Sequence, residues 1–340
     1  MKIRPALAVA ASVAALAASA ASAAAAPAPS YAVTQQWAGP DGGWDFSSFD
    51  PQRRRLYIAR TDGVTAVDVA SGEVTAHLLQ AARTHAAIPI NHGDEVLVTE
   101  GATSSVLIAD AATGAVRATL HAGKKPDAAM VEPRTGLAMV FDNDGGGVAL
   151  IDPKSAKVVG VIATPGKLES PAADGTGRVF VNVEDLAQIL VLDVAHRRVL
   201  TRYPLPGCDS PSGLAYQPKT RLLVAACANH QALVVKADGG AVVARLPIGG
   251  RPDWAGYDPA SGLVLIPTGE DGVVNLISAP SAKSVRVAGK APGHPGSRSG
   301  AIDPASGRFY LPSADFVPTP GGRPVAMAGS FRILTLEPAR

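Results

Sequence analysis

The sequence is short of the features that mark many protein classes. Only two of its 340 residues are cysteine, 5% are aromatic and 18% are charged. It contains no C-x-x-C-H, P-loop or H-E-x-x-H motif, and Gly296–Gly300 has arginine where a G-x-S-x-G elbow needs its nucleophile. These absences exclude c-type haem attachment, the common nucleotide-binding loop and the common zinc-protease and serine-hydrolase motifs.

Long hydrophobic runs are also missing. No later segment reaches the roughly 18 consecutive apolar residues that cross a bilayer. Residues 1–26 predict a secretory signal peptide, with Lys2 and Arg4, an apolar stretch over 6–20 and cleavage near residues 20–26. No cysteine precedes Cys208, so a lipidated N-terminus is excluded. We expect a periplasmic or secreted protein without a membrane span.

The mature chain has no excess of either charge. Removing Lys2 and Arg4 from the 31 basic residues leaves 29, equal to the 29 acidic residues. Such a balance provides no general field for nucleic acid, so we expect no nucleic-acid partner. Glycine (35) and proline (28) are abundant, a mixture typical of short strands joined by tight turns.

A repeated phrase organises the chain. It begins with an acidic or polar residue, often followed by proline, and continues through a turn into a short apolar strand, as in D-P-A-S-G-L-V-L-I at 258–266. The copies begin at Asp50, Asn91, Glu132, Asp174, Gln217, Asp258 and Asp303. A period of 40–45 residues with room for four strands is the signature of a propeller blade.

Seven such copies predict an all-β fold: a seven-bladed β-propeller of four-stranded antiparallel blades, forming one domain over 31–340. The last copy ends at its third strand, near residues 329–336. We expect residues 31–39 to supply the missing outer strand and close the ring, which removes exposed sheet edges.

The repeats resemble the YVTN-type (YncE-like) seven-bladed propellers, a family of exported bacterial proteins with WD40-like blade architecture. The matching motifs are G-x-x-P-D at Gly123–Asp127 and Gly249–Asp253, together with the D-P-x-x-G-R-L-Y-V hairpin. The resemblance implies the fold, whereas members of this family include binders, lactonases, quinoprotein subunits and proteins without an assigned activity. Fold alone carries no function.

Chemistry is expected at the channel mouth, where the innermost strands begin. Aspartates of the repeated phrase instead organise hairpin turns. Alignment of the repeats places one residue of each blade at the mouth: Asp45, Ala86, Asp127, Glu169, Ser212, Asp253 and Arg298. Loops on the same face add His230 and the acidic residues Asp142, Asp144, Glu184 and Glu270. Trp254 follows Asp253 and offers an aromatic face.

Three interpretations of this mouth remain open. It is a solvated acidic rim, a cation site for which calcium is the expected ion, or a pocket for a small polar ligand. For the cation, Asp142, Asp144, Glu184 and Glu270 are the candidate ligands. His85 and His92, seven residues apart, are either a ligand pair or isolated surface histidines.

The two cysteines are predicted to form a disulfide. Cys208 precedes the first strand of the fifth blade and Cys227 ends its second, so they fall opposite each other across antiparallel neighbours. Export permits oxidation.

Taken together, the sequence favours a monomeric binding or scaffold module that takes a small polar ligand through its acidic face, rather than an enzyme. A metal-dependent lactonase or other hydrolase is one alternative. A cell-envelope module that binds a protein partner is another.

Overall fold

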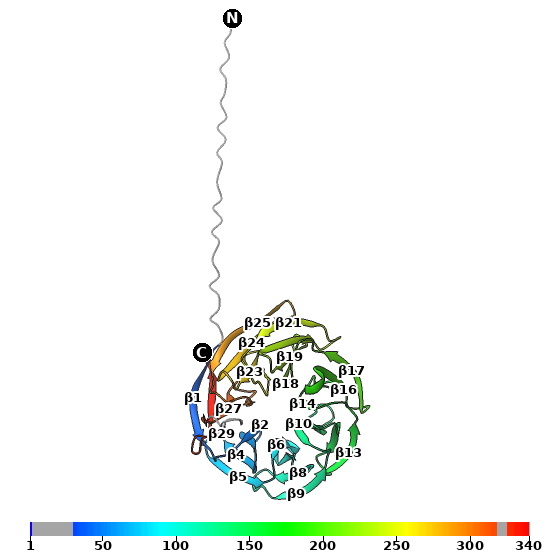
Figure 1. The fold of residues 1–340 in the computed structure, drawn as a ribbon, viewed down its shortest axis with the longest axis vertical. Helices are drawn as coiled ribbons and strands as arrows, with labels where there is room; N and C mark the ends of the chain where they lie inside the picture. Colours follow the sequence, from blue (N-terminus) through cyan, green and yellow to red (C-terminus); the bar gives the residue numbers. More distant parts are fainter. Residues whose placement is uncertain (2–29, 318–324, 340) are drawn as a thin grey trace.

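The computed structural model describes Met1 and residues 30–317 and 325–339. Apart from Met1, the predicted signal peptide lies outside these residues. The described chain forms seven four-stranded antiparallel sheets arranged as blades around a central axis, which confirms the predicted propeller (Figure 1).

The blades follow one another along the chain, each running from its inner to its outer strand. Blade 1 contains β2 (Trp44–Asp50), β3 (Arg55–Arg60), β4 (Gly63–Asp68) and β5 (Val74–Gln80), and blade 2 contains β6 (Thr84–Ile90), β7 (Glu95–Glu100), β8 (Ser105–Asp110) and β9 (Val116–His121). Blade 3 contains β10 (Pro126–Val131), β11 (Ala138–Asp142), β12 (Val148–Asp152) and β13 (Lys157–Ile162), and blade 4 contains β14 (Leu168–Ala173), β15 (Arg178–Val183), β16 (Gln188–Asp193) and β17 (Arg198–Pro204).

The remaining blades keep this order until the ring closes. Blade 5 contains β18 (Pro211–Gln217), β19 (Leu222–Cys227), β20 (Gln231–Lys236) and β21 (Val242–Pro247), and blade 6 contains β22 (Gly256–Asp258), β23 (Leu263–Thr268), β24 (Val273–Ser281) and β25 (Ser284–Pro292). Blade 7 contains β26 (Ala301–Ile302), β27 (Phe309–Ser313), β30 (Arg332–Pro338) and, outermost, β1 (Tyr31–Ala38). A hairpin of β28 (Phe316–Val317) and β29 (Val325–Ala326) is inserted between β27 and β30.

Helix is almost absent from the described residues. Two single 3-10 turns occur, η1 (Asn91–Gly93) and η2 (Glu184–Leu186). Neither approaches the length and hydropathy that a membrane crossing needs.

The hydrophobic core is divided among the blade interfaces. Each of the seven apolar clusters joins one blade to the next, and the cluster containing Trp44 and Ile333 joins blade 7 to blade 1. The second strand of each blade is covered on both faces, so residues 56–59 of β3 are all fully buried. This is why these strands read as continuous apolar runs rather than as alternating ones.

Ring closure relies on β1, which lies beside β30 from Tyr31 opposite Pro338 to Ala38 opposite Arg332. The hydroxyl of Tyr31 donates a hydrogen bond to Asp258 of blade 6 (2.7 Å). Arg60 of blade 1, 1% exposed, donates to the carbonyl oxygens of residues 40–42 that lead from β1 to β2. Its guanidinium also lies 3.8 Å from the ring centroid of Phe331 in blade 7. The closing blade is therefore held to blade 6 through Tyr31 and to blade 1 through Arg60.

The repeated aspartates organise turns, as predicted. Asp258 accepts hydrogen bonds from the backbone amides of Ala260 (2.9 Å) and Ser261 (3.1 Å). Gly262 then adopts φ +74°, which disfavours a side chain. These carboxylates are used in turn formation, at the end of each inner strand away from the predicted mouth.

The second repeat is shifted by one residue from its prediction. Ile90, not Asn91, ends the inner strand and pairs with Glu95, as Asp50 pairs with Arg55 in blade 1. Ile90 is apolar, whereas most blades have a polar residue at this turn position. The second repeat was therefore predicted to begin one residue too late, at the polar Asn91. The correction also moves the channel-mouth position of blade 2 from Ala86 to His85.

Candidate functional site

A backbone irregularity recurs where the inner strands of blades 1–5 begin. In blade 1, Trp44 pairs with Arg60 and Ser47 with Ile58, which leaves two residues between the pairs on one strand and one on the other. Blades 2–5 repeat this β-bulge. Bulges redirect side chains. The first bulged residue, and its equivalents in blades 6 and 7, are Asp45, His85, Asp127, Glu169, Ser212, Asp253 and Arg298. We call this set the mouth ring.

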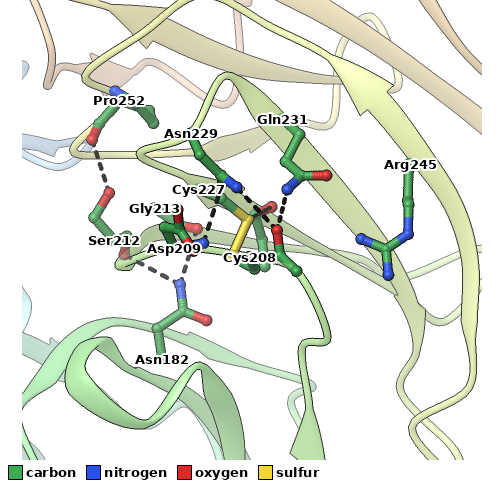
Figure 2. The surroundings of a disulfide bond; sticks show 12 residues. Asn182, Cys208, Asp209, Ser212, Gly213, Cys227, Asn229, Gln231, Arg245 and Pro252 are labelled. Carbon is green, nitrogen blue, oxygen red and sulfur yellow. Dashed lines mark hydrogen bonds between the residues drawn. A yellow bond between two sulfur atoms is a disulfide. The ribbon is translucent and has the colours of Figure 1, made fainter.

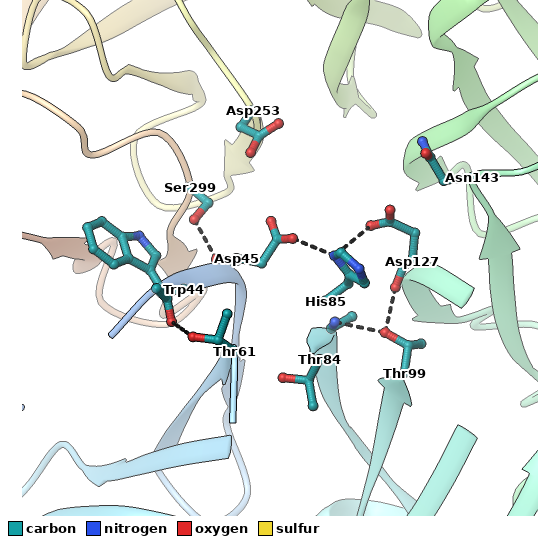
Figure 3. A network of polar contacts seen from close by, with 12 residues as sticks. Trp44, Asp45, Thr61, Thr84, His85, Thr99, Asp127, Asn143, Asp253 and Ser299 are labelled. Carbon is teal, nitrogen blue, oxygen red and sulfur yellow. Dashed lines mark hydrogen bonds and ion pairs between the residues drawn. The ribbon is translucent and has the colours of Figure 1, made fainter. Parts of the chain in front are cut away.

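Three members of the mouth ring form an ion triad (Figure 3). His85 Nδ1 lies 2.7 Å from Asp45 Oδ2 and 3.7 Å from Asp127 Oδ1. Burial opposes protonation of His85, but the hydrogen bond with Asp45 and the charge of Asp127 outweigh it and raise the pKa of the imidazole. The structure thus places a histidine between two carboxylates from neighbouring blades.

Asp127 is the most buried acid of the triad, at 6% exposure. Burial raises the pKa of its carboxyl to about 7; His85 opposes this rise and Asp45 adds to it. Lys125 Nζ lies 3.7 Å from Asp127 Oδ2 and donates a hydrogen bond to Asn143 Oδ1 (2.8 Å). Asp127 thus favours its protonated form far more than an exposed aspartate would.

The polar network continues into blade 4. Asn143 Nδ2 donates to Glu169 Oε1 (2.6 Å). Burial, together with the charges of Asp127 and Asp253, raises the pKa of Glu169 well above its usual range. A carboxylate in this position gains from any cation that reaches it.

Across the ring, Arg298 binds Asp253, with Nε 2.7 Å from Oδ2. Burial raises the pKa of Asp253, while Arg298 opposes this rise. Arg298 also donates to the carbonyl oxygen of Trp44 (3.1 Å), which ties blade 7 to blade 1. The Ser212 hydroxyl donates to the carbonyl oxygen of Pro252 (2.7 Å), so this member of the ring is engaged with the backbone.

The predicted cation ligands are not brought together. Both oxygens of Asp142 accept backbone amides, those of Lys124 and Lys125 on one side and of Asp144 and Gly146 on the other. Asp144 is exposed and Glu184 half-buried. Within the described residues, these three acids belong to neither of the two clusters whose ligand atoms lie within 4.8 Å of one another.

The two clusters differ in burial. One is Asp45, His85 and Asp127, within the mouth ring. The other consists of His230, Glu270 and Asp271 on the exposed rim between blades 5 and 6, where His230 Nε2 lies 3.6 Å from Glu270 Oε2. The rim group is open to water, so its charges are screened.

A cavity of about 150 Å³ adjoins the mouth ring within the channel. Its wall is mostly apolar and comes from the inner strands of blades 1–5, including Phe46 and Met130, and from Trp254 and Ala255 just before β22 of blade 6. The Trp254 indole stacks on Phe309, with ring centroids 5.5 Å apart. Ser47 and Ser170, at 9% and 4% exposure, also line this cavity. Neither hydroxyl has a hydrogen-bond partner among the described residues.

The predicted disulfide is present. Cys208 and Cys227 are joined, with Cα atoms 5.4 Å apart (Figure 2). Cys227 ends β19 and pairs with Pro211, the first residue of β18, which follows Cys208 by three residues. The bond fastens the segment that leads into β18, at the blade end where the mouth ring lies.

Sequence reasoning missed His85 and Lys125 as members of this network. His85 was obscured by the one-residue shift of its repeat, although it lies 40 residues after Asp45 and 42 before Asp127. Lys125 stands inside the G-x-x-P-D motif, where only the aspartate was singled out. His92, seven residues after His85, is exposed at the other end of β6, so the two histidines form no pair.

Comparison with known proteins shows the fold alone. No protein-family model matches the chain, and no curated protein matches it either. A chain from a structure described as "Crystal Structure of Mitotic Checkpoint Complex" superposes with TM-score 0.75 at 13% identity, over 90% of this chain and 91% of that one. A chain of Kuenenia stuttgartiensis hydrazine synthase superposes with TM-score 0.65 at 16% identity, over 79% and 92%. The protein is thus similar to both in being a β-propeller.

Proposed function

We propose that this chain is an exported binding protein of the YVTN type that takes a small polar ligand at the mouth ring. The observation that carries the proposal is the convergence of Asp45, Asp127, Glu169 and Asp253 from four different blades. These four acids outnumber the two permanent cations beside them, Arg298 and Lys125, and the remaining partner, His85, is titratable. Partly desolvated carboxylates with incomplete pairing are costly to the fold, which is typical of a site kept for binding.

Export is supported by two independent features. The leader pattern of residues 1–26 predicts secretion, and the Cys208–Cys227 disulfide fits an oxidising compartment. The G-x-x-P-D motif supports the YVTN assignment, since its aspartates are the mouth-ring residues Asp127 and Asp253.

The proposal is tested by a thermal-shift screen of small polar compounds against the mature protein. A ligand at a hundred times its Kd adds about 2.7 kcal/mol to stability, which raises the melting temperature measurably. The rise should disappear in Asp253→Asn and persist in the rim control Glu270→Gln. If every hit stabilises both variants equally, the mouth ring is not the site.

A metal-dependent hydrolase is the second candidate, because Asp45, His85 and Asp127 present three ligand atoms within 4.8 Å of one another. Three protein ligands with an open position are characteristic of catalytic zinc sites. Calcium, which prefers six to eight oxygen ligands, fits this nitrogen-containing triad less well. Elemental analysis of the purified protein, followed by lactone hydrolysis assays with and without chelator, tests this alternative. Stoichiometric metal with chelator-sensitive turnover would establish it.

A further inference from the structure

In blades 1–4, and at Asp253–Trp254 before β22, a mouth-ring residue is followed directly by a residue that lines the cavity. Asp45 precedes Phe46 and Ser47, and Glu169 precedes Ser170. The cavity-lining residues therefore begin one position after the mouth-ring residues on these strands. The two features are complementary halves of one site.

The carboxylates of the mouth ring favour a ligand with a cationic group. Four carboxylates face two permanent cations, and each cation is already engaged, Arg298 with Asp253 and Lys125 with Asn143 and Asp127. Among the described residues, the carboxylate of Asp45 has the titratable His85 as its direct partner, and that of Glu169 has the amide of Asn143. An ammonium group donating to these oxygens would complete their hydrogen bonding with a charge-assisted contact.

The size and lining of the cavity favour a ligand whose remaining part is compact and mostly apolar. A volume of about 150 Å³ matches the size of cavity that accepts one benzene ring. Phe46, Met130 and Trp254 line it with aromatic and thioether surface, which favours an aromatic ring. The unpartnered hydroxyls of Ser47 and Ser170 are more than nine-tenths buried. They are available to a polar substituent or to a water that accompanies the ligand.

Resting on the proposed function, we propose that the ligand is a small primary amine with an apolar, preferably aromatic, body. Its ammonium group binds between Asp45 and Glu169 at the mouth ring, and its body fills the cavity between Phe46 and Trp254.

The test is calorimetric titration of the mature protein with benzylamine and with benzyl alcohol, its uncharged counterpart. Benzylamine should bind and benzyl alcohol should bind at least about tenfold more weakly, the difference expected when a charged hydrogen-bonding group is removed. Glu169→Gln, which retains the acceptor for Asn143, should weaken benzylamine by about tenfold to a hundredfold. Glu270→Gln is the matched control and should leave the affinity unchanged.

The apolar half is tested separately with Ala129→Leu, which places a larger side chain in the cavity from β10 and leaves the ring residues intact. Binding of benzylamine should fall at least about tenfold, while methylamine should be unaffected. Melting curves establish that each variant is folded. A crystal soaked with 4-bromobenzylamine gives an independent readout, because the bromine should appear by anomalous scattering in the cavity even if a variant fails to fold.

The outcomes separate this inference from the proposed function. Equal binding of benzyl alcohol overturns the cationic head group, and an Ala129→Leu variant that binds benzylamine normally overturns the apolar body. If no amine binds but another compound from the screen is lost in Asp253→Asn, the inference fails and the proposed function stands. If no compound depends on the ring, both fail.

Discussion

The buried carboxyl of Asp127 predicts that the protein loses stability as the pH rises from 5 to 8. Burial raises its pKa to about 7 in the folded state, against about 3.9 in an unfolded chain. Between these values the folded state binds more protons than the unfolded state, so the free energy of unfolding falls as the pH increases. The whole shift corresponds to about 4 kcal/mol, of which about 2–3 kcal/mol falls between pH 5 and pH 8.

Other mouth-ring groups act in the same direction. The pKa values of His85, Glu169 and Asp253 are raised, so each of these groups also favours the folded state at the lower pH. Replacement by asparagine removes the titration of Asp127 and keeps the approximate shape of the side chain. Asp127→Asn should therefore reduce the pH dependence, and the remaining slope should come from the other three groups.

Urea denaturation at pH 5, 6, 7 and 8 measures the effect. The control is Asp238→Asn on the outer surface. Hydrogen bonding by Arg221, and then by Arg178, lowers the pKa of Asp238 to about 2, so its contribution is complete above about pH 5. That variant should shift the whole curve without changing its slope in this range. If Asp127→Asn retains the slope of the unmodified protein, Asp127 is not the group that titrates.

Three predictions concern ring closure and the disulfide. Replacing Cys208 and Cys227 by serine should cost about 3 kcal/mol by the chain-entropy account, measured by urea denaturation beside the reduced protein; an unchanged midpoint would show that the bond does not constrain the unfolded chain. Arg60→Met should lower the free energy of unfolding by about 1–2 kcal/mol, because the buried guanidinium of Arg60 donates to three partly buried carbonyl oxygens that would lose this donor. Unchanged stability would refute a role for Arg60 in ring closure. Tyr31→Phe should cost about 1 kcal/mol through its bond to Asp258, and no change on melting would show that this contact is dispensable.

Much of the fold was determined by local sequence signals. Each blade repeats the same short turn and apolar strand, and such signals need only a few neighbouring residues to be read. The period therefore predicted seven blades, and the constant distance from each turn to its strand entry located six of the seven mouth-ring positions. Blade 2 was misplaced because Ile90 stands where the turn signal is usually polar. The disulfide followed from antiparallel register in one blade.

What the ring does chemically was decided by the tertiary structure. Nothing local to His85 indicates that Asp45 and Asp127, each about forty residues away, will flank it. Lys125 and Asn143 become part of the network only because adjacent blades pack against each other. The raised pKa values depend on burial, and the unpartnered hydroxyls of Ser47 and Ser170 depend on a cavity whose lining comes from six blades. Conformational propensity depends on residues within one strand or turn, so it can be read from the sequence. Desolvation and charge interactions at the mouth ring depend on residues from different blades, which only the closed ring brings together.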